Sequence, residues 1–389
     1  MMLGFLLARA GIDVVVLEKH ADFNRDFRGD TIHPSTLELM HELGLLEEFL
    51  KLPHQELREL RGNVNGHTVP LADFSKLPTR CKFIAFMPQW DFLNFLATQG
   101  KSFSNFRLIT QAEVVDLVAS GDRIAGLRAQ TPNGEVKIIA DLVVGADGRH
   151  SCVRDAARME VIEKGVPIDV LWMRISKKPD DPDQSLGFFR GKKLMVLLDR
   201  GEYWQCGYII PKGALEQLKR DGLQDFHRAL VGMAPFLSDR VDELDDWEDI
   251  KLLTVQINRL RQWCREGLLC IGDAAHAMSP AGGVGINLAI QDAVATANLL
   301  TETLRRGPVP LSQLRRVQQR REWPTRLIQL MQTFVHRRIV TGRGTGETSH
   351  LPFIARMLRQ FPLLRQIPAR FIGIGPRPEH IRPRFAQPR

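Results

Sequence analysis

The chain has 389 residues, a length that accommodates about two to three domains. Its hydrophobic content of 44% is typical of a soluble globular protein, and no apolar run is long enough to cross a membrane. The 5 cysteines are scattered, odd in number and without any C-x-x-C pair, so the sequence indicates neither a disulfide framework nor a bound metal such as zinc. A reducing cytoplasm is therefore the expected compartment.

The net charge of +8 is unevenly distributed along the chain. From Arg305 to Arg389 the only carboxylates are Glu322, Glu347 and Glu379, among many arginines. This pattern is typical of a solvated, arginine-rich helical cap. The alternative is attraction to an anionic membrane surface, or to an anionic substrate or cofactor phosphate. Nucleic acid is not expected as a partner, because no recognised binding motif accompanies the charge.

The first residues carry the second half of a βαβ unit. Residues 2–10 show a helical apolar pattern, and residues 13–17 predict a buried strand that ends at Glu18. In dinucleotide-binding folds an acidic residue at this position hydrogen-bonds the adenosine ribose, so Glu18 is a predicted nucleotide contact. The first strand and the G-x-G-x-x-G loop of such a unit are missing, and Gly4 is their only remnant. We therefore expect the sequence to be truncated at its N-terminus.

Residues 268–289 carry the most informative pattern in the chain. They predict a buried strand, a stop at Gly272 and Asp273, a glycine-rich loop and then a helix. Small residues in such a loop let the backbone approach a ligand closely. The start of a helix offers free N–H groups and the positive end of the helix dipole, which suits an anionic ligand.

This segment resembles the second FAD-contacting motif of the flavin-dependent aromatic hydroxylases, the para-hydroxybenzoate hydroxylase-like family. The family pattern of GD, small residues, P, G-x-G and N is met by Gly272, Asp273, Pro280, Gly283, Gly285 and Asn287. A second family landmark, D-G-x-x-S-x-x-R, follows a predicted strand and is met by Asp147, Gly148, Ser151 and Arg154. The two motifs in this order are more specific than either alone.

The resemblance implies a set of cofactor contacts. Asp273 would hydrogen-bond the ribityl hydroxyls of FAD, and the backbone that follows Gly283 would face the pyrimidine end of the flavin. Arg28 falls where the family places an arginine near the adenosine diphosphate. Gln89 falls where the family places a glutamine, just ahead of a helix, that contacts the flavin side of FAD. The complete predicted set is Glu18, Arg28, Gln89, Val114, Asp147, Asp273, Pro280, Gly283, Gly285, Ile286 and Asn287.

The implied fold class is α/β: a doubly wound, Rossmann-like FAD-binding domain, an inserted and mainly antiparallel β-sheet substrate domain, and C-terminal helices. Short strands near 114–118, 124–128 and 136–139 predict an antiparallel meander, and 184–211 predict a further sheet. The expected divisions are an FAD-binding part, a substrate domain to which 55–80 also contribute, a second FAD-binding part and a helical region, at 1–160, 161–255, 256–310 and 311–389.

Three expectations concern the helices. One helix should open at Pro34 and continue to Leu50. Basic helices should fill residues 311–340 with a break at Pro324. The proline-punctuated tail near 367–378 should pack along the surface.

The resemblance also implies the reaction. NADPH or NADH reduces FAD, dioxygen adds to the reduced flavin, and the C4a-hydroperoxide transfers one oxygen atom to a small aromatic substrate, phenolic or polyketide-like. The enzyme is expected to be a monomer or a homodimer. Two alternatives stay open. One is a quinone-ring hydroxylase at the membrane surface, suggested by the basic C-terminal region, and the other is a non-catalytic, truncated relic of such an enzyme.

Catalytic residues are not assigned from the sequence. Hydroxylation of a phenol usually needs a base that favours the phenolate. His20, His54, His67 and Tyr208 are candidates only because they titrate or donate and lie in loops or in the predicted substrate sheet. His276 is interpreted as a packing or hydrogen-bonding residue, since no Ser-His-Asp order or metal-ligand spacing surrounds it.

Overall fold

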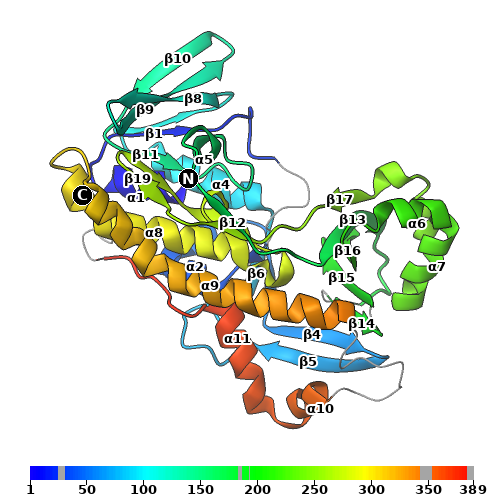
Figure 1. Ribbon diagram of the computed structural model, residues 1–389. Helices are drawn as coiled ribbons and strands as arrows, with labels where there is room; N and C mark the ends of the chain where they lie inside the picture. The colour runs from blue at the N-terminus through cyan, green and yellow to red at the C-terminus, as the bar shows by residue number, and fades with distance from the viewer. Residues whose placement is uncertain (25–30, 183–185, 192, 342–352, 383–389) are drawn as a thin grey trace.

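The computed structural model describes residues 1–24, 31–182, 186–191, 193–341 and 353–382 (Figure 1). Two lobes are visible in this part of the chain. The first is built around α1 and α8, and the second is a twisted sheet covered by α6 and α7. A set of C-terminal helices runs along both lobes.

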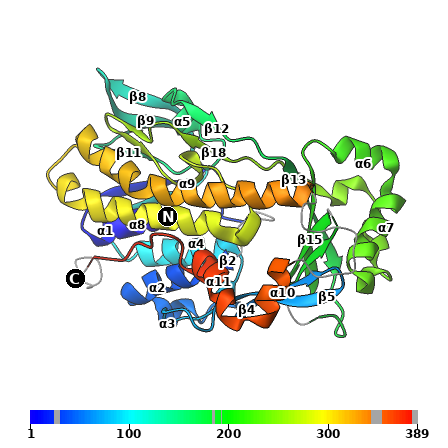
Figure 2. The same ribbon diagram turned by 60° about the horizontal axis from the view of Figure 1, so that its bottom comes forward.

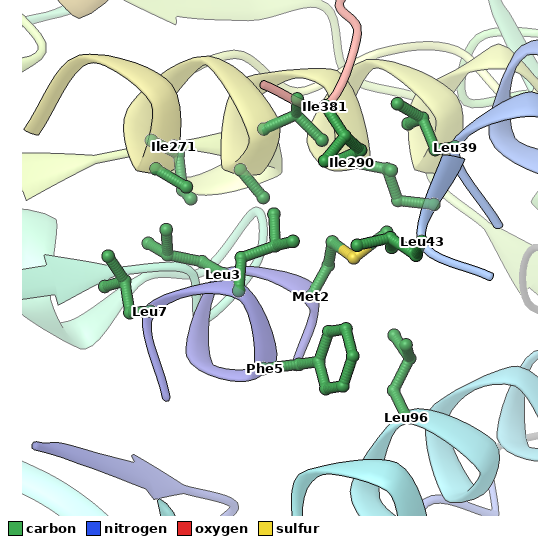
Figure 3. Close-up of a cluster of buried hydrophobic side chains, with 14 of the residues drawn as sticks. Met2, Leu3, Phe5, Leu7, Leu39, Leu43, Leu96, Ile271, Ile290 and Ile381 are labelled. Atoms are coloured by element: carbon green, nitrogen blue, oxygen red, sulfur yellow. The ribbon is translucent and has the colours of Figure 1, made fainter. Parts of the chain in front are cut away.

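Helix α1 (Met2–Arg9) lies in the core of the first lobe, because most of its side chains are apolar and buried. Figure 3 shows its side chains pointing toward those of α2 (Pro34–Glu42), α4 (Gln89–Gly100) and α8 (Val284–Leu304). Gly4 lets the helix approach the following strand closely, since a Cβ there would lie 2.6 Å from Cγ2 of Val16. The predicted first helix is confirmed.

Two sheets of the first lobe contain short parallel strand pairs. They join β1 (Val14–Leu17) to β7 (Phe106–Ile109), and β11 (Val143–Gly145) to β20 (Leu268–Cys270), which also pairs with β19 (Cys264–Arg265). With helices on both sides, this arrangement confirms the α/β class. The remaining sheets of the lobe are the predicted meander of β8 (Glu113–Ser120), β9 (Arg123–Thr131) and β10 (Gly134–Ile139), the set β2 (Thr31–Ile32), β6 (Ile84–Phe86) and β3 (Gln55–Leu57), and the pair β12 (Val161–Glu163) and β18 (Asn258–Leu260).

The second lobe is a seven-stranded sheet. All neighbouring strands are antiparallel except β14 and β4, which are parallel. Helices α6 (Leu215–Asp221) and α7 (Leu223–Met233) cover its outer face and bury Trp204, while the other face is turned toward the first lobe (Figure 1). The strand order is β17 (Lys251–Leu253), β13 (Ile168–Ser176), β16 (Tyr203–Pro211), β15 (Lys193–Asp199), β14 (Leu186–Arg190), β4 (Glu59–Val64) and β5 (His67–Asp73).

The helix predicted from Pro34 to Leu50 is wrong in its length. Helix α2 ends at Glu42, and Gly44 has φ 74°, a left-handed conformation that stops a helix. The chain then turns into α3 (Leu46–Phe49), a separate short helix. The single apolar pattern therefore spans two helices that share one buried side.

The break expected at Pro324 is also wrong. Helix α9 (Leu311–Thr341) runs through the proline without interruption. A proline inside a helix deprives the carbonyl four residues earlier of its N–H partner, and here that carbonyl belongs to Arg320. Nη1 of Arg377 donates to this carbonyl at 3.4 Å, so a partner from the C-terminal segment replaces the lost bond.

The C-terminal segment is partly buried rather than confined to the surface. It forms α10 (Phe353–Gln360) and α11 (Gln366–Gly373), and α11 packs against the second lobe through Ala369. The chain after α11 runs back along α8 and α9 (Figure 2). There Glu379 and Ile381 are buried, and the carbonyl of His380 accepts a hydrogen bond from Asn298.

Candidate functional site

The turn at the end of β20 presents an acidic side chain. Strand β20 is buried and stops at Gly272, whose φ of 58° is left-handed and whose Cβ, if present, would lie 3.0 Å from the Cβ of Ala289. A glycine is therefore required where the turn passes α8. The 3-10 helix η4 (Gly272–Ala274) follows and leaves Asp273 half-buried.

The glycine-rich loop ends at the start of α8. Gly282 and Gly283 have φ of 79° and 62°, and a Cβ on Gly283 would lie 2.3 Å from Oγ1 of Thr31. Among the described residues, no side chain caps the N-terminus of α8. The free N–H groups of this 21-residue helix, together with the positive end of its dipole, therefore provide a place for negative charge.

The acidic turn and the start of α8 adjoin each other. An ideal Cβ on Gly285 would lie 4.0 Å from Oδ1 of Asp273 and would meet nothing closer, so the backbone is open at this point. Nη2 of Arg149 lies 3.7 Å from Oδ2 of Asp273, and both side chains are partly exposed. The carboxylate of Asp273 can accept hydrogen bonds from hydroxyl groups, and the N–H groups at the start of α8 can donate to an electron-rich ring edge. These residues therefore fit the ribityl chain and the pyrimidine edge of a flavin.

Residues near α2 hold the loop and the helix start in place. The carbonyl of Gly283 is contacted by Oγ1 of Thr31 at 3.3 Å and by Nε2 of His33 at 3.1 Å. Oδ1 of Asn287 accepts hydrogen bonds from the hydroxyls of Ser35 and Thr36, both at 2.9 Å. The side chain of Asn287 thus joins α8 to α2.

His33 is fully buried, and its second ring nitrogen, Nδ1, lies 2.7 Å from the carbonyl of Ile372 on α11. Burial lowers the pKa of His33 below its ordinary value. The two carbonyl contacts raise this pKa, but their effect is smaller than that of burial. The sequence suggested only a helix start for residues 30–35. The histidine contacts were missed because both of their carbonyl partners lie more than 200 positions away along the chain.

Asp147 organises a corner of the fold. Its carboxylate accepts hydrogen bonds from Oγ of Ser151 at 2.5 Å and from the N–H of Val153 at 3.1 Å, at the start of α5 (Cys152–Ala156). Arg154 is buried and donates to the carbonyl of Arg149 at 3.0 Å. The D-G-x-x-S-x-x-R motif therefore places Arg149 beside Asp273. Arg149 occupies one of the variable positions of the motif, and the sequence analysis missed it for that reason.

The other predicted contacts within the described residues come from separate elements of the first lobe. Glu18 directly follows β1, and its carboxylate accepts a hydrogen bond from the N–H of His20 at 3.0 Å and interacts electrostatically with the amine of Met1. Gln89 is the half-buried first residue of α4. Val114 lies on β8 and packs at the edge of a small apolar cluster. Arg28 lies outside the described residues.

The candidate bases do not gather at this site. Tyr208 lies on the sheet face that packs against α7, where its ring meets Phe226 edge-on at 5.5 Å and where burial raises its pKa to about 12. It is therefore not suited to act as a base toward a substrate on the other face. His20 and His67 are exposed, and His54 is held by the carbonyl of Leu52 at 2.8 Å.

Comparison with known proteins identifies the chain as a flavoprotein oxidoreductase. A family model described as an FAD binding domain matches residues 1–328, and the chain belongs to this family. It is 30% identical to 6-methylpretetramide 4-monooxygenase of Streptomyces rimosus over 377 residues, which cover 94% of this chain and 87% of that protein. The chain is thus an FAD-dependent monooxygenase.

Solved structures show the same fold. The anhydrotetracycline hydroxylase OxyS of Streptomyces rimosus aligns with a TM-score of 0.73 and 22% identity over 96% of this chain and 73% of that chain. PqsL of Pseudomonas aeruginosa, described as a probable FAD-dependent monooxygenase, aligns with a TM-score of 0.74 and 20% identity over 88% of this chain and 94% of that chain.

Proposed function

We propose that the chain hydroxylates a small aromatic substrate, phenolic or polyketide-like, with NADPH or NADH and dioxygen as co-substrates. The observation that carries the proposal is the meeting of Asp273 with the uncapped start of α8. Bound FAD supplies the chemistry of NAD(P)H oxidation and oxygen activation. The similarity to 6-methylpretetramide 4-monooxygenase over most of both proteins supports a substrate of that general kind.

In this proposal the residues of the turn and of the helix start hold the cofactor. The carboxylate of Asp273 accepts hydrogen bonds from the ribityl hydroxyls, and Glu18 accepts them from the adenosine ribose. The N–H groups at the start of α8 face the flavin pyrimidine and stabilise negative charge on the reduced ring. They belong to Gly285, Ile286 and Asn287, and the further proposed contacts are Arg28, Gln89, Val114, Asp147, Pro280 and Gly283.

The seven-stranded sheet is the proposed substrate domain, formed by residues 161–255 together with strands β4 and β5 from 55–80. Its inner face carries Trp172, Ile209 and Leu253, which are partly buried and pack against the buried cluster of Ile168, Val170 and Val255 on the side opposite α7. Gly207 lies beneath the indole of Trp172, where a Cβ would approach to 2.9 Å. An apolar face with an aromatic side chain suits a flat aromatic substrate.

The direct test is incubation of the purified chain with FAD, followed by desalting and an absorption spectrum. We expect a retained flavin band and NADH or NADPH oxidation that is stimulated by phenolic or polyketide-like substrates, with hydroxylated product detected by mass spectrometry. Retained FAD without any product from such a panel would contradict the substrate proposal. Failure to retain FAD would favour the alternative of a non-catalytic relic.

A second candidate is a quinone-ring hydroxylase at a membrane surface. The observation that favours it is a group of apolar side chains exposed on α10 and the chain beyond it, including Phe353 at 68% and Leu363 at 72%. Arg356 and Arg359 are exposed on the same short helix. Apolar and cationic side chains together suit the interface of an anionic bilayer. No helix in the described residues has the length and apolar content of a membrane span.

Co-sedimentation with vesicles tests this candidate. We expect the chain to bind phosphatidylserine-containing vesicles at about 0.15 M salt more strongly than phosphatidylcholine vesicles, and Leu363→Ser to weaken that binding. Equal and negligible sedimentation with both vesicles would contradict a membrane role, whatever the outcome of the FAD test.

We further propose a cytoplasmic location and a monomeric or homodimeric state. All 5 cysteines are free thiols, which supports a reducing compartment. Light scattering during size-exclusion chromatography distinguishes the two oligomeric states, and a larger assembly would contradict both.

A further inference from the structure

A buried network of charged groups lies directly behind the turn that carries Asp273. Its centre is Asp292 on α8, which is fully buried. One carboxylate oxygen of Asp292 accepts hydrogen bonds from the N–H of Gly272 at 3.0 Å and from Nε2 of His276 at 2.6 Å. The other accepts one from Nε of Arg321 at 3.0 Å. Asp292 therefore holds the backbone immediately before Asp273.

The network continues from α9 into the C-terminal segment. Nη1 of Arg321 donates to the carbonyl of Arg377 at 3.0 Å and to Oε1 of Glu379 at 3.3 Å. Glu379 also accepts a hydrogen bond from Nε of Arg320 at 2.7 Å, and its own N–H donates to Gln291 on α8. The two helices and the returning segment lie side by side in Figure 2, so the network joins three parts of the chain.

The charges in this network alternate in sign. Asp292, Arg321 and Glu379 are all at least nine-tenths buried. Burial alone would raise the pKa of Asp292, but His276, Arg321 and the N–H of Gly272 outweigh it and hold the pKa below its ordinary value. Buried charges persist only when they are paired and hydrogen-bonded, so each member depends on its neighbours. The carboxylate of Asp292 is thereby fixed as a charged acceptor beside the turn.

We propose that Asp292 is a positioning residue that sets the orientation of Asp273 toward FAD, and that Arg321 and Glu379 extend this control to the C-terminal segment. The inference rests on the proposed contact between Asp273 and the ribityl chain. Asp292 acts only through the turn, because its carboxylate is enclosed by the Gly272 N–H, His276 and Arg321. Loss of its charge weakens the hydrogen bond from the Gly272 N–H and lets the Asp273 carboxylate turn away from the cofactor.

A double-mutant cycle on the dissociation constant for FAD tests the proposal. The four proteins are the unaltered chain, Asp273→Asn, Asp292→Asn and the double variant, measured by flavin fluorescence quenching. We expect each single change to weaken FAD binding by about tenfold and the double change to weaken it little further, because both remove the same contact. Additive losses, or an Asp292→Asn variant that binds FAD normally, would overturn the proposal.

The same cycle separates this inference from the proposed function. If Asp273→Asn leaves FAD binding unchanged, the assignment of Asp273 fails and the positioning role fails with it. If Asp273→Asn weakens binding but the two changes are additive, only the positioning role fails. A non-additive result supports both.

Three further variants distinguish the proposed coupling from a general loss of folding. Leu300→Ala removes a buried side chain near the far end of α8. Urea unfolding measures the loss of stability in Leu300→Ala and in Asp292→Asn, so that the two losses can be compared. We expect Leu300→Ala to keep normal FAD affinity. Where Asp292→Asn does not fold, Glu379→Gln replaces it in the cycle. Arg326→Lys, in the exposed Arg326–Glu322 pair on α9, is the control for Glu379→Gln. The coupling is supported if Glu379→Gln weakens FAD binding and Arg326→Lys does not. Equal effects of the two variants on FAD binding overturn it.

Discussion

Two buried aspartate–arginine pairs, one in each lobe, differ in what they hold in place. In the first lobe Asp292 pairs with Arg321 and also accepts a hydrogen bond from the Gly272 N–H in the turn that carries Asp273. In the second lobe Asp181 pairs with Arg240 and accepts a hydrogen bond from Nε1 of Trp204 at 2.7 Å, in the core beneath the sheet. All four charged side chains are almost completely enclosed.

The two pairs are equally buried, but we expect their loss to affect FAD binding differently. Removing one partner of either pair leaves a buried charge uncompensated, so both pairs contribute to stability in the same way. Only the first pair is connected to backbone next to Asp273. Stability and cofactor affinity therefore separate between the lobes, and substitutions chosen in matched pairs can test that separation.

The largest effect is expected from Arg321→Met and Arg240→Met. Each should lower the free energy of unfolding by about 3–5 kcal/mol, since each removes the guanidinium partner of a buried carboxylate. Only Arg321→Met should weaken FAD binding. Urea unfolding and flavin titration of both variants measure the two quantities, and an equal loss of FAD affinity in both would remove the distinction between the lobes.

A smaller effect is expected from Gly283→Ala, compared with Gly201→Ala in a hairpin of the second lobe. Both glycines have left-handed φ, but only the new Cβ at position 283 would meet another residue, Oγ1 of Thr31 at 2.3 Å. We expect Gly201→Ala to cost about 1 kcal/mol of stability, and Gly283→Ala up to about 3 kcal/mol with weakened FAD binding. Thermal unfolding and flavin titration provide the comparison. Identical losses would show that the contact with Thr31 has no influence.

His336 on α9 should contribute to the pH dependence of the free energy of unfolding. Its Nε2 lies 3.0 Å from Oγ of Ser279 in the glycine-rich loop, and burial lowers its pKa to about 4. As the pH falls below about 6.5, the unfolded chain takes up a proton that the folded chain refuses, so this contribution to stability is lost between about pH 6.5 and 4. The urea midpoint should fall less steeply over this range in His336→Gln. Parallel pH profiles would contradict the assignment.

The smallest effect is expected from Tyr208→Phe. The phenol lies in the apolar core against α7 and not on the inner face of the sheet. We expect turnover to change by less than about twofold and stability by roughly 0.5 kcal/mol or less. A large loss of turnover at unchanged stability would restore Tyr208 as a candidate base.

The sequence motifs predicted the local parts of the site well. A strand end, a glycine and a helix start follow each other within residues 268–289, so the turn and the open end of α8 could be inferred without tertiary contacts. The α/β class followed from the same motifs. Their roles toward FAD stay predictions that the experiments above address.

Contacts between distant segments could not be predicted. Arg321 and Glu379 reach the turn only because α9 and the C-terminal segment fold back against α8. The same segment supplies Arg377 to the carbonyl of Arg320, which is why the local rule for Pro324 failed. Single-sequence patterns record the preferences of neighbours along the chain and not the partners that the fold brings together.

The most direct test of the site is FAD retention after desalting by the unaltered chain, by Asp273→Asn and by Asp181→Asn. The last two remove the same charge from the first and the second lobe. We expect the flavin absorption band in the unaltered chain and in Asp181→Asn, and its loss in Asp273→Asn. A flavin band of full intensity in Asp273→Asn would contradict the assignment of the turn and the start of α8 as the FAD site.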